Sequence, residues 1–123
     1  MLEELKKELA NLDEVNFAIK LMRANRLTEG EGAELESNII GYYTYCMSQD
    51  TVLSAKEADF MEEMLRKEDE NGKKYPKNKI EIMWDATDEG KTRYKIANLI
   101  KVLQEQLKSV RNYNFYLRSE KKI

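Results

Sequence analysis

The chain has 123 residues, of which 36% are charged, with one proline, one cysteine and no histidine. This composition favours helices over a turn-rich β fold, and the single cysteine excludes an internal disulfide framework and fits a reducing compartment. Because it has neither an apolar run of about 18 residues nor the apolar core of a signal peptide, we expect no membrane segment and one soluble, cytoplasmic domain over residues 1–123.

Two short helices are predicted before residue 28. Apolar residues three or four positions apart mark one face of the first helix: Leu2, Leu5, Leu9 and Leu12. A break at 11–13 follows, where Asp13 can cap the next helix. That second helix has the apolar face Val15, Ala18, Ile19 and Met22. One continuous helix over 2–26 fits the same periodicity, so both alternatives stay open.

Two further helices are predicted between residues 28 and 67, each opened by a capping box. In Thr28–Glu31, the hydroxyl and the carboxylate can satisfy each other's free backbone amides, which predicts a helix that passes through Cys46. Residues 48–53 are predicted to form a loop. A second capping box, Ser54–Glu57, then opens an amphipathic helix that ends near Lys67.

Residues 68–79 form the clearest predicted break, with the loop proper at 71–79. They are rich in charge, contain the turn dipeptide Asn71-Gly72 and include the single proline. The segment that follows is ambiguous, because Ile80, Ile82 and Trp84 alternate like a strand, whereas a helix capped by Asn78 fits equally well. A lone strand would have nothing to pair with, so we predict a helix.

The last quarter of the chain is predicted to be one long amphipathic helix, because no proline or glycine lies between Gly90 and Glu120. At the usual rise per residue this helix is about 45 Å long, whereas a compact domain of this size is only about 35 Å across. We therefore expect its apolar stripe to bind a second copy or another protein through Ile96, Ile100, Leu103, Leu107, Val110 and Leu117. The predicted fold is all-α, a four- or five-helix bundle with coiled-coil character. Its acidic part is residues 1–70, and residues 80–120 form a long, partly basic helix.

Charge is distributed unevenly along the chain. Residues 1–70 hold 17 acidic and 8 basic side chains, whereas residues 91–123 hold two acidic and nine basic ones. A basic helix with aromatic residues can contact phosphates and stack on bases. The candidate nucleic-acid contacts are Lys101, Lys108, Arg111, Tyr113, Tyr116 and Arg118. The alternatives are a solvated basic flank with the aromatic residues in the core, or attraction between an acidic and a basic half of the fold.

No catalytic residue, cofactor site or metal site is predicted. The absence of histidine removes the commonest general base and metal ligand, and Cys46 lies in an apolar helical pattern that fits a buried structural thiol. The glycines occur in no phosphate-binding frame, and the acidic stretches around Gly72 and Gly90 lack the ligands of a calcium loop. Carboxylates such as Glu34 and Glu57 fit solvated helix faces. We therefore expect no enzyme activity.

In its small size, helical pattern and content of lysine and asparagine, the chain resembles accessory proteins of phages and mobile elements. The opening LEELKKEL, the Asn38…Tyr42 segment and Leu107-Lys108-Ser109 are loosely similar to phage recombination mediators of the UvsY type, over fewer than a quarter of the residues. That family consists of small helical oligomers, and a phage protein of this kind works in the host cell cytoplasm. We predict a non-enzymatic, oligomeric accessory protein that binds proteins through helical surfaces. The alternative is a recombination-mediator-like factor that binds nucleic acid through the basic helix.

Overall fold

The computed structural model describes Lys7 and residues 12–120. These residues form four helices: α2 (Leu12–Arg23), α3 (Glu29–Arg66), α4 (Lys77–Asp85) and α5 (Asp88–Glu120). Apart from an isolated bridge between Glu68 and Lys74, the same residues contain no β pairing, which confirms the predicted all-α class with a long C-terminal helix. The first predicted helix lies outside the described residues, so the choice between a break at 11–13 and a continuous helix stays open.

The fold divides into two compact units. The terminal unit comprises the described residues within Met1–Tyr45 and Ile100–Ile123, and the central unit comprises Cys46–Leu99. Both α3 and α5 contribute to both units. The single domain over residues 1–123 stays a prediction.

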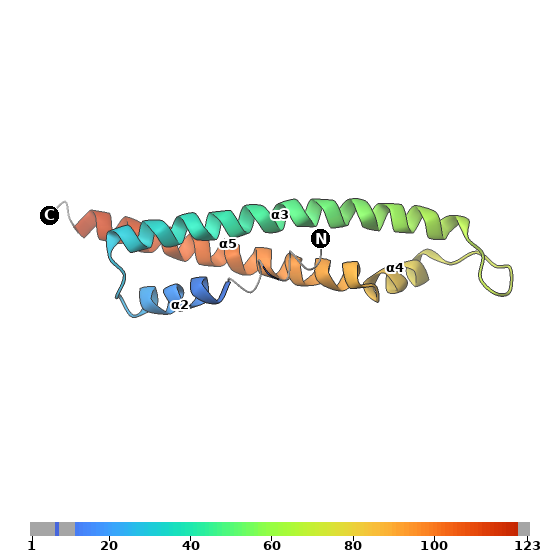
Figure 1. The fold of residues 1–123 in the computed structure, drawn as a ribbon, viewed down its shortest axis with the longest axis horizontal. Helices are drawn as coiled ribbons and strands as arrows, with labels where there is room; N and C mark the ends of the chain where they lie inside the picture. Colours follow the sequence, from blue (N-terminus) through green and yellow to red (C-terminus); the bar gives the residue numbers. More distant parts are fainter. Residues whose placement is uncertain (1–6, 8–11, 121–123) are drawn as a thin grey trace. The chain divides into compact units, whose positions relative to one another are not determined.

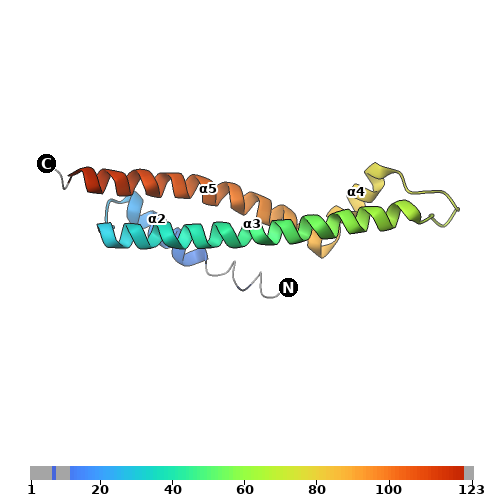
Figure 2. The same cartoon turned by 90° about the horizontal axis from the view of Figure 1, so that it is seen from above.

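In the terminal unit, α2 lies beside the first part of α3 and the last part of α5 (Figures 1 and 2). Asn16 on α2 accepts a hydrogen bond from Gln106 on α5 at 3.3 Å. Helix α2 ends at Arg23 and is followed by a Schellman cap, in which Asn25 has a φ of 59° and the N–H groups of Asn25 and Arg26 donate to carbonyls of the last helical turn. This cap turns the chain back into α3, so that α2 and α3 run antiparallel.

The start of α3 is the capping box that the sequence predicts. The Thr28 N–H donates to Glu31 Oε1, and the Glu31 N–H donates to Thr28 Oγ1, both at 3.2 Å. Two backbone donors that the first helical turn leaves without partners are thereby satisfied.

Helix α3 continues without interruption to Arg66, so the predicted loop at 48–53 and the second cap at Ser54–Glu57 are wrong. The physical reason is a seven-residue repeat of buried side chains that runs through the expected loop. It consists of Ile39, Cys46 and Leu53 on α3, and α5 carries a matching set, Ile96, Leu103 and Val110. Such a repeat is typical of coiled-coil packing, and burying a large aliphatic side chain contributes about 1.5–3 kcal/mol. This gain in burial outweighs the preference of the polar residues in 48–53 for a loop conformation.

In the central unit, α4 lies beside the last part of α3 (Figure 2). The ring centroids of Trp84 on α4 and Phe60 on α3 are 5.6 Å apart. Residues 80–84 are helical, as predicted, but α4 begins at Lys77 after an N-cap at Pro76. The predicted cap at Asn78 and the loop over 77–79 are therefore wrong. Proline suits this position because its fixed φ and missing N–H cost nothing at a helix start.

The helix predicted over 80–120 is interrupted, because α4 ends at Asp85 and α5 begins at Asp88. Thr87 Oγ1 donates to the Trp84 carbonyl at 2.6 Å and accepts from the Gly90 N–H at 3.0 Å, which caps α5. A Cβ atom at Gly90 would overlap the Trp84 carbonyl, so this tight junction requires glycine. The acidic residues Asp88 and Glu89 fall in the first turn of α5, where the helix dipole favours them.

Candidate binding groove

Half of the apolar stripe that we expect to bind a partner is buried inside the chain. Ile96, Leu103 and Val110 are fully buried, whereas three members of the set are partly exposed: Ile100, Leu107 and Leu117. Helix α3 has 38 residues, and it pairs with α5 in each unit. Because α5 has this partner within the chain, its length no longer argues for a second copy.

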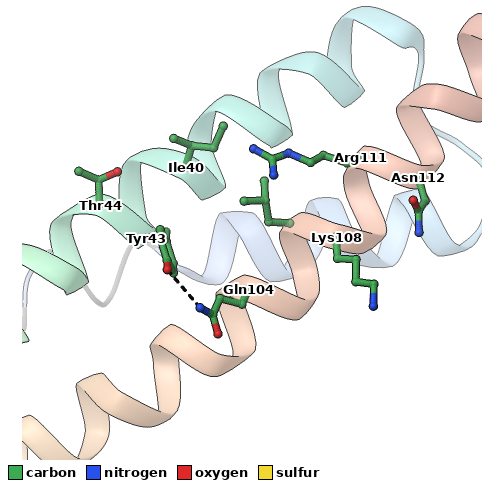
Figure 3. Close-up of a pocket in the computed structure, with 8 residues that line it drawn as sticks. Ile40, Tyr43, Thr44, Gln104, Lys108, Arg111 and Asn112 are labelled. Atoms are coloured by element: carbon green, nitrogen blue, oxygen red, sulfur yellow. Dashed lines mark hydrogen bonds between the residues drawn. The ribbon is translucent and has the colours of Figure 1, made fainter.

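A groove of about 640 Å³ lies between α3 and α5 in the terminal unit (Figure 3). Among the described residues, its lining comes from these two helices: Ile40, Tyr43, Thr44, Gln104, Leu107, Lys108, Arg111 and Asn112. We call it the α3–α5 groove. Helix α2 contributes nothing to this lining and instead contacts α5 through the hydrogen bond between Asn16 and Gln106. The α3–α5 groove is therefore the flank of the helix pair that α2 leaves uncovered.

Apolar side chains and one polar link make up the floor of the groove. Ile40 is 38% exposed although it is large and aliphatic, and Leu107 is partly exposed beside it. Across the groove, Gln104 Nε2 donates to the Tyr43 hydroxyl oxygen at 3.1 Å (Figure 3). This solvent-exposed bond links α3 to α5 across the groove.

The edge of the groove on α5 is cationic. Lys108, Arg111 and Arg118, which we call the cationic row, lie three or seven residues apart and therefore on one flank of the helix. Figure 3 shows Arg111 reaching toward α3, while Lys108 points away from it. None of the three forms an ion pair with another described residue. Phe115, which is 72% exposed, lies on the same flank.

The remaining candidate nucleic-acid contacts lie elsewhere. Lys101 lines a second groove, of about 460 Å³, with Ile19 and Arg23 of α2. Tyr113 is half-buried, and its hydroxyl donates to the Leu27 carbonyl at 2.7 Å, so it anchors the connection between α2 and α3. Tyr116 is exposed and donates to Glu120, a bond that raises the pKa of the Tyr116 hydroxyl.

Sequence reasoning missed the α3 side of the groove. Ile40 and Tyr43 follow the same periodicity as buried residues of α3, so nothing in that segment distinguishes a groove residue from a core residue. Only the pairing of α3 with α5 leaves them at an open flank. Phe115 follows Lys108 by seven residues and therefore shares its face.

The described residues contain no group of three or more Cys, Asp or Glu side chains that is placed to hold a metal ion. Cys46 is buried, and desolvation raises the pKa of its thiol above the ordinary value, which disfavours the reactive thiolate. In the region that the structure covers, no helix combines the length and apolar character needed to cross a membrane.

Comparisons with protein-family models, with curated proteins and with solved structures gave no match to this chain.

Proposed function

We propose that this chain is a non-enzymatic accessory protein that binds other proteins through its helical surface, with the α3–α5 groove as the binding site. One observation carries the proposal: an open groove has an apolar floor, formed by Ile40 and Leu107, and a cationic edge without ion pairs. Exposed apolar surface bounded by polar groups is typical of protein-binding sites. The phage- or mobile-element-like setting in a host cytoplasm belongs to the same proposal, and it rests on composition.

Affinity capture with a matched pair of variants tests the proposal. Ile40→Glu puts a charge on the groove floor, whereas Ile82→Glu makes the same change at a position on α4 that is 68% exposed. Circular dichroism first establishes that both variants fold. From a lysate of the source organism, we expect the wild type and Ile82→Glu to retain the same partner and Ile40→Glu to lose it. Equal capture by all three chains, or by none, would overturn the proposal.

Self-association is the second part of the proposal, and light scattering on the full chain tests it. A second copy that occupied the groove would give an oligomer that Ile40→Glu converts to a monomer. A wild-type chain that is monomeric at all concentrations would remove self-association and leave partner binding in place.

Nucleic-acid binding is the alternative function, and the cationic row with the exposed Phe115 favours it. Labelled single-stranded and duplex DNA are titrated at two salt concentrations with the wild type and with Lys108→Glu/Arg111→Glu. Phosphate contacts predict that binding weakens with salt and is lost in the variant. No binding at the lower salt concentration would remove this alternative.

A further inference from the structure

We infer that the α3–α5 groove takes an acidic amphipathic helix of another protein. This inference rests on the proposed function and adds the chemical nature of the partner. Three features of the terminal unit carry it: the position of the groove in the helix arrangement, its apolar floor, and the sign of the charges at its edge.

No helix of the described residues covers the groove. In the terminal unit, α2, α3 and α5 are packed as three helices, with α2 on one flank of the α3–α5 pair. A further helix against the other flank would complete a four-helix arrangement. The lining runs from Ile40 to Thr44 on α3 and from Gln104 to Asn112 on α5. Nine helical residues span about 13 Å, enough for apolar anchors at positions i, i+3, i+4 and i+7 of a docked helix.

The charges at the groove select an acidic partner. Lys108 and Arg111 are the charged residues of its described lining, and Arg118 continues the same flank. On α3, Glu36 lies one turn before Ile40 and accepts a hydrogen bond from the Asn114 amide at 3.4 Å. Glutamates beside the apolar anchors of a docked helix would pair with the cationic row.

A nucleic acid or a second copy of this chain would use only part of the groove surface. A nucleic acid would meet the cations but would leave the aliphatic floor without a partner. A symmetric dimer through the groove would present the same patch from both copies and bring two sets of cations together. An acidic amphipathic helix uses both the floor and the charged edge.

Two synthetic helical peptides of roughly 18 residues test the inference. Both carry leucines at i, i+3, i+4 and i+7, and one has glutamates where the other has lysines. Fluorescence anisotropy with the full chain should show that the glutamate peptide binds at least about tenfold more tightly than the lysine peptide, with the difference decreasing at high salt. Equal binding of the two peptides, or tighter binding of the lysine peptide, would overturn the inference.

Variants assign the binding to the groove. Lys108→Glu/Arg111→Glu should invert the preference between the peptides, and Ile40→Glu should weaken both. The matched control is Lys91→Glu/Lys95→Glu, which reverses two exposed cations on α5 within the central unit and should leave both affinities unchanged. If the control variant weakens binding of the glutamate peptide as much as the groove variant does, the net charge of the chain causes the loss, and the inference is overturned.

The outcomes separate this inference from the function on which it rests. If neither peptide binds while groove-dependent capture of a partner persists, the acidic helix is wrong and the binding function stands. An oligonucleotide could instead displace the glutamate peptide, with binding that requires Lys108 and Arg111. The groove would then bind nucleic acid, and the inference of an acidic helix would be wrong.

Discussion

Asn114 is the buried polar residue of α5, and its environment explains why α3 has glycine at position 32. Asn114 is 2% exposed, and its Nδ2 donates to the Gly32 carbonyl at 3.0 Å. A Cβ atom at Gly32 would overlap Asn114 Oδ1, which has no hydrogen-bond partner among the residues that the structure describes. A single asparagine in an otherwise apolar helix seam fixes the register of the pair at some cost in stability. Here the contact specifies that the start of α3 faces the end of α5.

Replacing Gly32 by alanine should therefore destabilise the fold. Overpacking costs about 1–3 kcal/mol, which exceeds the gain of about 1 kcal/mol in helix propensity. Gly41→Ala is the matched control, since it lies within the same helix and a Cβ atom there meets nothing within 4 Å. We expect Gly41→Ala to raise the free energy of unfolding and Gly32→Ala to lower it, measured by urea denaturation. A stabilised Gly32→Ala chain would show that Asn114 moves away freely.

At the scale of elements, Arg93 joins α5 to α3 in the central unit. Its Nε lies 3.3 Å from Asp50 Oδ1, and its Nη1 pairs with Glu57. The three side chains are each about one-third exposed, so solvent weakens their attraction but does not abolish it. Glu57, which resembled a capping residue in sequence, thus serves to hold two helices together.

Arg93→Met should cost about 1–2 kcal/mol, because it leaves two partly buried carboxylates without a cation. The control is Arg66→Met, which removes an exposed pair with Glu62 within one helix and should cost less than about 0.5 kcal/mol. Thermal unfolding in low salt measures both. If the two variants lose equal stability, Arg93 contributes no more than a surface ion pair.

The elements also show where local sequence signals succeed and where they fail. Thr28–Glu31 caps a helix as predicted, but the similar pattern at Ser54–Glu57 lies inside α3. The difference is tertiary, because Leu53 is fully buried against the rest of the fold and keeps the preceding turn helical. Conversely, a break occurs at Thr87, where apolar periodicity alone suggested one helix over 80–120. Capping patterns indicate where a helix can begin, and packing decides whether it does.

For the molecule as a whole, the sequence predicted the fold class and the cations of the groove, but it did not predict the groove. Lys108 and Arg111 were candidates because charge is visible in any single helix. Predicting the apolar floor of the groove would have required knowing which residue of α3 faces which residue of α5. That register is set by contacts such as Tyr43 with Gln104, between residues far apart in the chain. The stripe of α5 was correctly identified as apolar, and three of its members, Ile96, Leu103 and Val110, pack inside the chain.

A matched pair of core variants tests whether the two units unfold as one domain. Ile39 lies in the terminal unit and Ile96 in the central unit, and both are fully buried. Replacing either by alanine removes the same atoms and should cost about 2–5 kcal/mol. Helices α3 and α5 are each continuous from one unit into the other. Unfolding of either unit would therefore also expose apolar side chains of these two helices in the other unit.

We therefore expect Ile39→Ala and Ile96→Ala each to lower the midpoint of a single calorimetric transition, with equal van't Hoff and calorimetric enthalpies. Two independent domains would instead give two transitions, with each variant shifting only one of them. Hydrogen exchange on the same variants locates the effect. In a single domain, Ile39→Ala accelerates exchange of the slowest amides in residues 46–99 as well as in its own unit. If the amides of residues 46–99 keep their protection from exchange in Ile39→Ala, the two units share helices but unfold independently.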